Sequence, residues 1–205
     1  MAAQSDRTLF IACGALGREI VALTSQHGWN ERLDVTCLPA IWHNYPQRIP
    51  AGVRAKIRAG KKKYGRIVVL YGDCGTGGEL DQVLQEEGVE RIAGPHCYEF
   101  FAGNRDFTQL SDEEPGSFYL TDYLARHFDR LIWQGLALDR HPELRDAYFG
   151  NYRRVVYLSQ IDDPNLLAKA QAAAARLGLD FLHRHTGYGE LAGYMVDEMR
   201  KSDGI

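Results

Sequence analysis

Short runs of apolar residues alternate along the chain with segments whose apolar positions recur every three or four residues. Apolar runs without polar interruption are typical of parallel strands buried on both faces, and helical spacing follows most of them. Because parallel strands require long crossovers, this order predicts an α/β fold with a three-layer, mostly parallel, doubly wound sheet of about six strands. We expect strands at 8–12, 33–38, 66–71, 89–93, 154–158 and 179–182 and helices at 18–27, 51–64, 79–87, 122–138, 142–152, 164–177 and from 190.

The 205 residues are enough for one substantial core, so we expect a single domain over 1–205 with a helical insertion or lid at about 116–152. Residues 103–115 are polar and end in an acidic group at 112–114, which predicts an irregular surface segment. The insertion is rich in aromatic residues and could supply the surface of a homodimer.

Composition excludes several classes of protein. Hydrophobic residues make up 45% of the chain, charged residues 25%, and the net charge is -3, which predicts a globular protein that does not bind nucleic acid. The sequence lacks both the apolar core of a signal peptide and the ~18 apolar residues of a membrane span. We therefore expect a cytoplasmic protein that does not associate with membranes.

The most informative stretch is the glycine-rich segment Leu70–Gly78, between an apolar run and a helical pattern. Four glycines within 72–78 allow positive φ angles and close approach of a ligand to the backbone. The N-terminus of the following helix offers free N–H groups and lowers the pKa of a nearby thiol. Cys74 is therefore a candidate metal ligand or nucleophile.

Other cysteines and histidines follow predicted strands in the same way. Carboxyl ends of parallel strands share one edge of a sheet, where ligands bind. Thiolates and imidazoles suit zinc, and three thiolates can also hold an iron–sulfur cluster. The predicted metal ligands are Cys13, Cys74, Cys97, His43 and His96, with either histidine as the fourth ligand.

Three further groups have predicted roles at this edge. Asp73 could orient a ligating histidine or act as a general base, while a turn-forming role beside the glycines is equally expected. His43 is the second candidate for proton transfer. His183 and His185 could join the same edge. Residues expected to contact a bound cofactor are Gly72, Gly75, Gly77 and Asn44.

Several short motifs resemble a domain-of-unknown-function family. The motif Tyr-Gly-x-Cys-Gly lies at 71–75 and Pro-Ala-x-x-His-Asn-x-Pro at 39–46, accompanied by Cys13 and Cys97. The sequence departs from the usual pattern at His96, where an acidic residue is ordinary, and at 122–123, where Asp-Tyr replaces Gly-Trp. Members of the family are often encoded near corrinoid-dependent methyltransferases, which implies a role in methyl transfer or in supplying its cofactor.

Three functions are compatible with these residues. The first is a zinc or iron–sulfur protein of one-carbon metabolism, in the enzymatic case a metal-dependent methyltransferase whose partner is a small-molecule substrate or a corrinoid protein. The second is a non-catalytic carrier or chaperone for a metal, corrinoid or cluster. The third is a metal-free thiol enzyme, in which Cys74 is the nucleophile and His43 or His96 the base.

Overall fold

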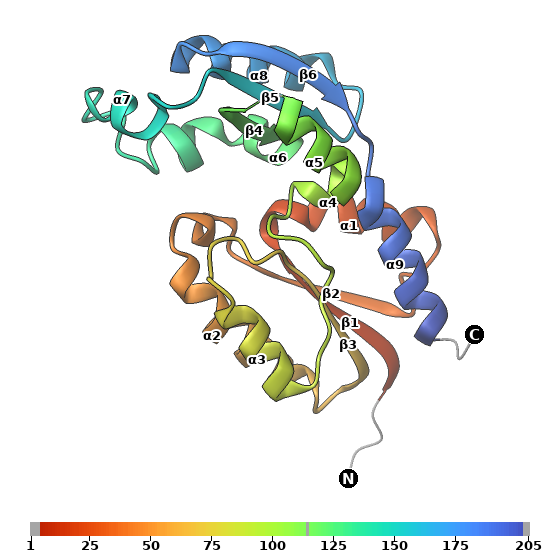
Figure 1. Ribbon diagram of the computed structural model, residues 1–205. Coiled ribbons are helices and arrows are strands. Elements are labelled where there is room, and N and C mark those ends of the chain that lie inside the picture. Colours follow the sequence, from red (N-terminus) through yellow and green to blue (C-terminus); the bar gives the residue numbers. More distant parts are fainter. Residues whose placement is uncertain (1–4, 114, 203–205) are drawn as a thin grey trace. The chain divides into compact units, whose positions relative to one another are not determined.

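The computed structural model describes residues 5–113 and 115–202. They fall into two compact units, 5–97 with 190–202, and 98–113 with 115–189 (Figure 1). Each unit contains a parallel sheet of three strands. The α/β class with parallel strands is confirmed, but a single six-stranded sheet is wrong. An apolar run makes a strand without specifying which other strand it pairs with. A single domain over the whole chain stays a prediction.

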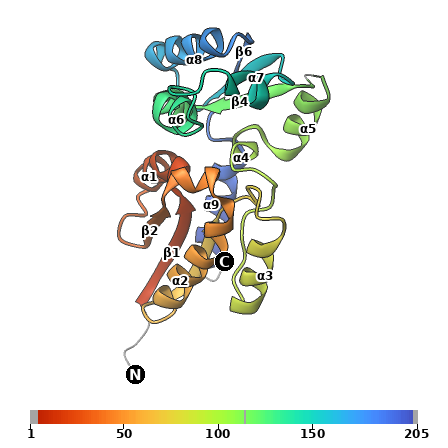
Figure 2. The same cartoon turned by 90° about the vertical axis from the view of Figure 1, so that its left-hand side faces the viewer.

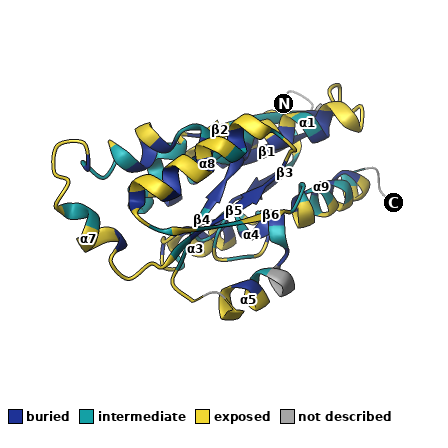
Figure 3. Ribbon diagram, turned by 90° about the horizontal axis from the view of Figure 1, so that it is seen from above, coloured by how far each residue is buried: buried dark blue, intermediate teal, exposed yellow. Residues whose placement is uncertain are grey.

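The first sheet has the strand order β2-β1-β3. Its strands are β1 (Ser5–Cys13), β2 (Leu33–Leu38) and β3 (Tyr64–Leu70), and β1 pairs in parallel with both neighbours. Ile11 of β1 lies between Thr36 and Val69 in this register. The central strand is buried, as the dark blue of β1 and β3 shows in Figure 3. The continuous apolar run at 8–12 follows from this burial on both faces.

Four helices cover this sheet: α1 (Gly17–Gln26), α2 (Ile49–Gly60), α3 (Glu79–Glu87) and α9 (Gly189–Ser202). Helices α2 and α3 lie side by side, with α9 on the opposite side of the sheet (Figures 1 and 2). Three short 3-10 helices accompany them, η1 (Gly14–Leu16), η2 (Ala40–Asn44) and η3 (Pro46–Arg48). Glu87 of α3 accepts hydrogen bonds from Arg58 of α2 and from Lys61, which directly follows α2, so charged side chains also connect the two helices.

The strand order of this unit creates a switch point. From β1 the chain moves to β2 on one side, and the next crossover returns past β1 to β3 on the other. The connections that leave the carboxyl ends of β1 and β3 therefore run in opposite directions, and open α/β sheets generally bind ligands at such a point.

The strand predicted at 89–93 is wrong. This segment makes a single parallel bridge, from Arg91 to Val69, and continues as a loop. The guanidinium of Arg91 donates to the backbone carbonyls of Ile92 and Gly94, which ties the segment into a turn. The turn prevents it from extending beside β3 as a fourth strand.

The second sheet has the order β4-β5-β6, again parallel throughout. Its strands are β4 (Ser117–Thr121), β5 (Arg154–Ser159) and β6 (Asp180–His185). Residues 155–158 of β5 are almost completely buried. As the central strand, β5 forms the core of this unit.

Helices cover both faces of the second sheet: α4 (Glu99–Ala102), α5 (Asn104–Glu113), α6 (Asp122–Arg126), the π-helix η4 (Asp129–Trp133), α7 (Leu144–Phe149) and α8 (Pro164–Leu177). Leu110 of α5 packs against Val156 and Leu158 on one face, while α6 and α8 pack on the other. Figure 3 shows α8 exposed on its outer side. Asp163 caps α8 by accepting a hydrogen bond from the N–H of Asn165 (2.9 Å).

Two segments of this unit differ from expectation. Residues 104–113 form helix α5 rather than an irregular segment, because Leu110 has an apolar surface to pack against; Glu114 lies outside the described residues. The helix predicted at 122–138 ends at Arg126 and resumes as η4. No helix built from the described residues is long and apolar enough to cross a bilayer.

Candidate functional site

The switch point of the first unit carries the chemistry-bearing residues. Cys13 is the last residue of β1, and the glycine-rich loop 71–78 follows β3. The two segments are adjacent because β1 and β3 pair in register from Leu9–Ile67 to Ala12–Leu70. The sequence prediction that strand ends bring these residues together therefore applies within this sheet.

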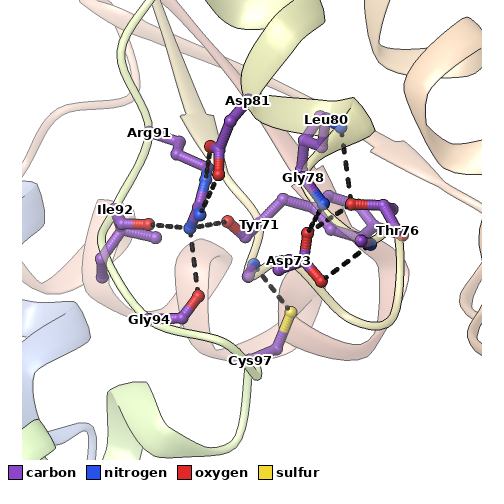
Figure 4. A network of polar contacts seen from close by, with 12 residues as sticks. Tyr71, Asp73, Thr76, Gly78, Leu80, Asp81, Arg91, Ile92, Gly94 and Cys97 are labelled. Carbon is purple, nitrogen blue, oxygen red and sulfur yellow. Dashed lines mark hydrogen bonds and ion pairs between the residues drawn. The ribbon is translucent and has the colours of Figure 1, made fainter.

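Asp73 shapes the glycine-rich loop (Figure 4). Its carboxylate accepts hydrogen bonds from the Thr76 hydroxyl (2.5 Å) and from the N–H groups of Gly78 (2.9 Å) and Gly77 (3.2 Å). Burial would raise the pKa of Asp73, but these bonds outweigh it and hold the pKa below its ordinary value. Both oxygens are engaged by the loop, which is the turn-forming role; a role as general base stays a prediction.

Arg91 fastens the next segment to the end of β3, as Figure 4 shows. It pairs with Asp81 of α3 (2.6 Å) and donates to the carbonyls of Ile92 and Gly94, both at 3.0 Å. Its side chain is only 15% exposed. One cation thus connects α3 to residues 91–94, which lead directly to His96 and Cys97.

Gly72 permits the close approach of that segment. A Cβ atom at this position would lie 2.9 Å from the Cα of His96 and 3.0 Å from the backbone nitrogen of Cys97, closer than real side chains allow. The Gly72 N–H points to the Cys97 sulfur at 3.5 Å, and the Cys74 N–H donates to the Pro95 carbonyl at 2.7 Å. Only glycine fits here.

Three thiols meet beside this loop, and we call Cys13, Cys74 and Cys97 the thiol cluster. The sulfurs of Cys74 and Cys97 are 3.3 Å apart, and Cys97 also hydrogen-bonds to Cys13. Cys13 and Cys74 are buried, with 6% and 7% exposure. Cys74 has φ 49°, a left-handed conformation that costs a non-glycine residue of order 1–3 kcal/mol and is typical of functional positions.

The pKa values of the three thiols are shifted in different directions. The hydrogen bond from Cys97 lowers the pKa of Cys74 well below its ordinary value, despite burial, and hydrogen bonds with His43 and His96 add to this. The same neighbour lowers the pKa of Cys13. Hydrogen bonds to both neighbours raise the pKa of Cys97 instead. Cys97 is therefore the proton donor between two acceptor sulfurs.

Two imidazoles border the thiol cluster. Hydrogen bonding to Cys74 raises the pKa of His43, which favours the protonated imidazole beside this sulfur. His43 belongs to η2, and Pro46 of the same segment lies against the loop, with its Cγ 3.6 Å from a Cβ position at Gly75. His43 is exposed to solvent, whereas His96 is half-buried. The imidazoles thus approach Cys74 from two different segments.

The geometry is that of a hydrogen-bonded cluster. Within the described part of the chain, no group of three or more His, Cys, Asp or Glu side chains stands ready to hold a metal ion. The metal roles of Cys13, Cys74, Cys97, His43 and His96 stay predictions. So do the cofactor contacts of Gly72, Gly75 and Gly77, which lie in the loop, and of Asn44, which lies beside His43 in η2.

Three residues lie outside this cluster. Cys37 is exposed on the edge strand β2. His183 and His185 belong to β6 of the second sheet, so the expectation that they share an edge with the cysteines fails together with the single sheet.

Sequence reasoning missed Tyr71 and Arg91. Tyr71 is 1% exposed, and its hydroxyl lies near Cys13 without a hydrogen bond of ordinary length. Burial, and then the charge of Cys13, raises its pKa. The position of Tyr71, between an apolar strand and a glycine-rich loop, could have indicated it, because a tyrosine that continues a buried strand places its hydroxyl in the interior. The corresponding signal for Arg91 was a charged residue within a segment predicted to be a strand.

Comparison with known proteins places the chain in a family without adding an activity. No curated protein and no solved structure matches it. A family model described as "Protein of unknown function (DUF1638)" matches residues 37–195. The match includes His43, Cys74, His96 and Cys97, while Cys13 precedes it. The chain therefore belongs to the family of proteins of unknown function DUF1638.

Proposed function

We propose that the first unit binds a thiophilic metal centre, a zinc ion or an iron–sulfur cluster, through Cys13, Cys74 and Cys97. One observation carries the proposal: three sulfurs from three separate segments meet at the switch point of the sheet, with Cys74 and Cys97 3.3 Å apart. Packing alone gives no reason for three thiols to converge, since a free cysteine otherwise behaves as a small apolar side chain.

The donor set suits such a centre. Tetrahedral zinc with Zn–S of about 2.3 Å implies sulfur–sulfur separations of about 3.8 Å, close to the observed contact. His43 or His96 would supply a fourth ligand. Closing the set requires at least one of these side chains to rotate, because the present arrangement does not surround a single point. His43 has room to do so, as an exposed residue on a short 3-10 segment.

A bound centre of this kind supplies Lewis-acid activation of a thiol or thioether. Around it, Gly77 leaves the backbone open to a ligand, since nothing lies within 4 Å of a Cβ position there, whereas the face of Gly72 is occupied by the segment that carries His96 and Cys97. With His96 as the fourth ligand, His43, hydrogen-bonded to Cys74 and exposed, would move a proton between solvent and an incoming group. Methyl transfer, with a corrinoid or corrinoid protein as partner, is the reaction class that the family resemblance adds. A non-catalytic carrier of metal, corrinoid or cluster is the other form of this proposal.

Anaerobic purification followed by metal analysis and an absorption spectrum tests the proposal. We expect stoichiometric metal: a colourless zinc protein, or a visible band from a cluster or corrinoid. Single Cys→Ser variants at 13, 74 and 97 should each lose the metal, whereas Cys37→Ser, at an exposed cysteine on the edge strand, should retain it. Metal retained in all three cluster variants would refute the assignment.

A metal-free thiol enzyme is the second candidate, favoured by Cys74 itself. This residue combines a left-handed backbone conformation, a lowered pKa and two imidazole neighbours, the setting of a nucleophile with an adjacent base. Protein that contains no stoichiometric metal after anaerobic preparation, with Cys74 alkylating far faster than the other cysteines, would support this candidate against the first.

A further inference from the structure

The second sheet has a polar cluster of its own at the carboxyl ends of its strands. In the register of β5 and β6, Tyr157 lies opposite His183, and Ser159 lies opposite His185. The two histidines are two positions apart on one strand, so their side chains project from the same face. The Ser159 oxygen lies 2.8 Å from Nε2 of His183 and 3.0 Å from Nδ1 of His185.

Two ring nitrogens therefore point at one oxygen. A serine hydroxyl has a single hydrogen and donates to no more than one of the imidazoles, so at least one ring must donate its N–H to the Ser159 oxygen. Ser159 is 2% exposed, whereas both histidines are exposed. The rings thus direct one nitrogen each toward a buried hydroxyl and remain open to solvent on their outer sides.

The positions of these groups are fixed by their neighbours. The Tyr157 ring stacks on His183 with centroids 5.3 Å apart and an interplanar angle of 19°. Thr186 donates to the Ser159 carbonyl through both its N–H (2.9 Å) and its hydroxyl (3.2 Å), which ties the end of β6 to the end of β5. The convergence is therefore held by packing and by backbone hydrogen bonds, and it does not depend on chance orientation of two surface side chains.

We propose that His183, His185 and the Ser159 hydroxyl bind a divalent transition-metal ion of the zinc, nickel and copper group. Imidazole is the protein ligand that these ions share, and Zn–N bonds are about 2.0–2.1 Å long. The two nitrogens lie 2.8 and 3.0 Å from the Ser159 oxygen, the spacing of neighbouring ligands around such an ion, so a rotation of each ring that directs its nitrogen at an ion beside Ser159 completes the set. The outer positions of the ion are left to water or a ligand.

The proposal is independent of the thiol cluster. It uses residues of the second unit alone, and its donors are two imidazoles and a hydroxyl rather than thiolates. Nickel can also bind thiolates, so the test must report on individual histidines.

Nitrogen-15 NMR of the histidine rings in the full-length protein provides that report. Substoichiometric paramagnetic Ni²⁺ should broaden the ring signals of His183 and His185 first, with His27 and His141 as internal controls. Signals of His43 and His96 report on the thiol cluster and are read separately. Broadening of the control rings to the same extent, or sharp signals from His183 and His185, would overturn the proposal.

Calorimetric titration with Ni²⁺ gives an independent readout. Compared with wild type, His183→Ala and His185→Ala should each lose one binding event, while His141→Ala, at an exposed histidine beside Glu143, should keep it. Ser159→Ala retains both imidazoles and should weaken that event by about 10- to 100-fold. Unchanged titrations of His183→Ala and His185→Ala contradict the site. If either variant fails to fold by circular dichroism, the NMR measurement on wild type decides.

Discussion

The sulfur of Cys74 lies 3.3 Å from the sulfur of Cys97, although 23 positions separate the two residues in the chain. No shared helix or strand pairing brings them together. The contact depends on the Cys74 N–H donating to the Pro95 carbonyl and on the bare backbone of Gly72 beneath residues 96 and 97. Any change that moves the segment 94–97 away from the end of β3 therefore separates the two sulfurs.

Gly72→Ala should break this contact. The added methyl group would lie 2.9 Å from the Cα of His96, so the segment must shift, at a cost of about 1–3 kcal/mol in the free energy of unfolding. Urea unfolding measures the loss, and the rate of Cys97 alkylation reports the displacement. Gly193→Ala is the matched control, because nothing lies within 4 Å of a Cβ at that position of α9. Equal stabilities of Gly72→Ala and wild type would refute the close approach.

Arg91→Ala should destabilise the first unit by roughly 2–3 kcal/mol, since carbonyls of a half-buried loop lose a charged donor. The side chain is 15% exposed and serves Ile92 and Gly94 in addition to Asp81. Arg58→Ala, which removes a 63% exposed partner of Glu87, should change stability by no more than ~0.5 kcal/mol. Chemical denaturation of both variants tests the difference. Comparable losses of stability in Arg91→Ala and Arg58→Ala would contradict the stabilising role of the Arg91 contacts.

Alkylation of the chelator-treated protein should depend on pH differently at two cysteines. The pKa of Cys74 is lowered, chiefly by its hydrogen bond with Cys97, so its thiolate persists at pH 6. Partial desolvation of its sulfur by neighbouring groups raises the pKa of Cys37, while the residue as a whole stays accessible to the reagent, so its alkylation should require alkaline pH. Mass spectrometry of iodoacetamide-labelled peptides between pH 5.5 and about 9 separates the two profiles. His43→Ala should shift the Cys74 profile to higher pH. Identical profiles for Cys37 and Cys74 would contradict the electrostatic account.

Acid should destabilise the attachment of α9 to the first sheet. Burial would raise the pKa of Glu198, but hydrogen bonds from Arg66 and Lys201 outweigh it and hold the pKa below the ordinary 4.5. Because the folded value is the lower one, this stabilisation is complete above pH 4.5 and is lost as pH falls through the folded pKa. Glu198→Gln should cost roughly 2–3 kcal/mol at pH 7, limited by the 33% exposure of Arg66.

Denaturant titrations at pH 7, 5, 4 and about 3 measure this effect. The difference between wild type and Glu198→Gln should shrink toward the acidic end. Asp197→Asn, at a 67% exposed carboxylate on the same helix, is the control and should differ little from wild type at any pH. A stability difference that is the same at every pH would show that the pH dependence does not come from Glu198.

Sequence alone located the elements that satisfy their own local requirements. The apolar runs at 8–12, 66–71 and 154–158 became strands because a buried strand must be apolar on both faces, and the edge strand at 33–38 followed from its alternating apolar positions. Asp163, Pro164 and Gly178 bounded α8 through contacts within a few residues, including φ 71° at Gly178. The same logic placed Cys74 in a turn rich in positive φ angles. Each of these decisions depends on near neighbours in the chain.

Elements that depend on distant partners were decided by the tertiary structure. The segment 89–93 has strand-forming residues, but Arg91 binds carbonyls that only the folded loop presents. Residues 104–113 contain few apolar side chains and become helical where Leu110 meets Val156 and Leu158. Whether six strands form one sheet or two depends on pairing, and the apolar pattern of a strand is the same for either outcome.

The thiol cluster combines both kinds of information. The sequence by itself determined that Cys13 ends a strand and that Cys74 lies in the loop after one, because strand boundaries follow from the local pattern of polar and apolar residues. Their meeting with Cys97 followed from the crossovers that set β1 beside β3 and from the approach that Gly72 permits. The pairing of Ser159 with His183 and His185 likewise arose from register, a property of two strands together. The chemistry of a side chain and its local position can be read from the sequence. Which other side chains it contacts is decided by long-range packing, because those partners come from distant parts of the chain.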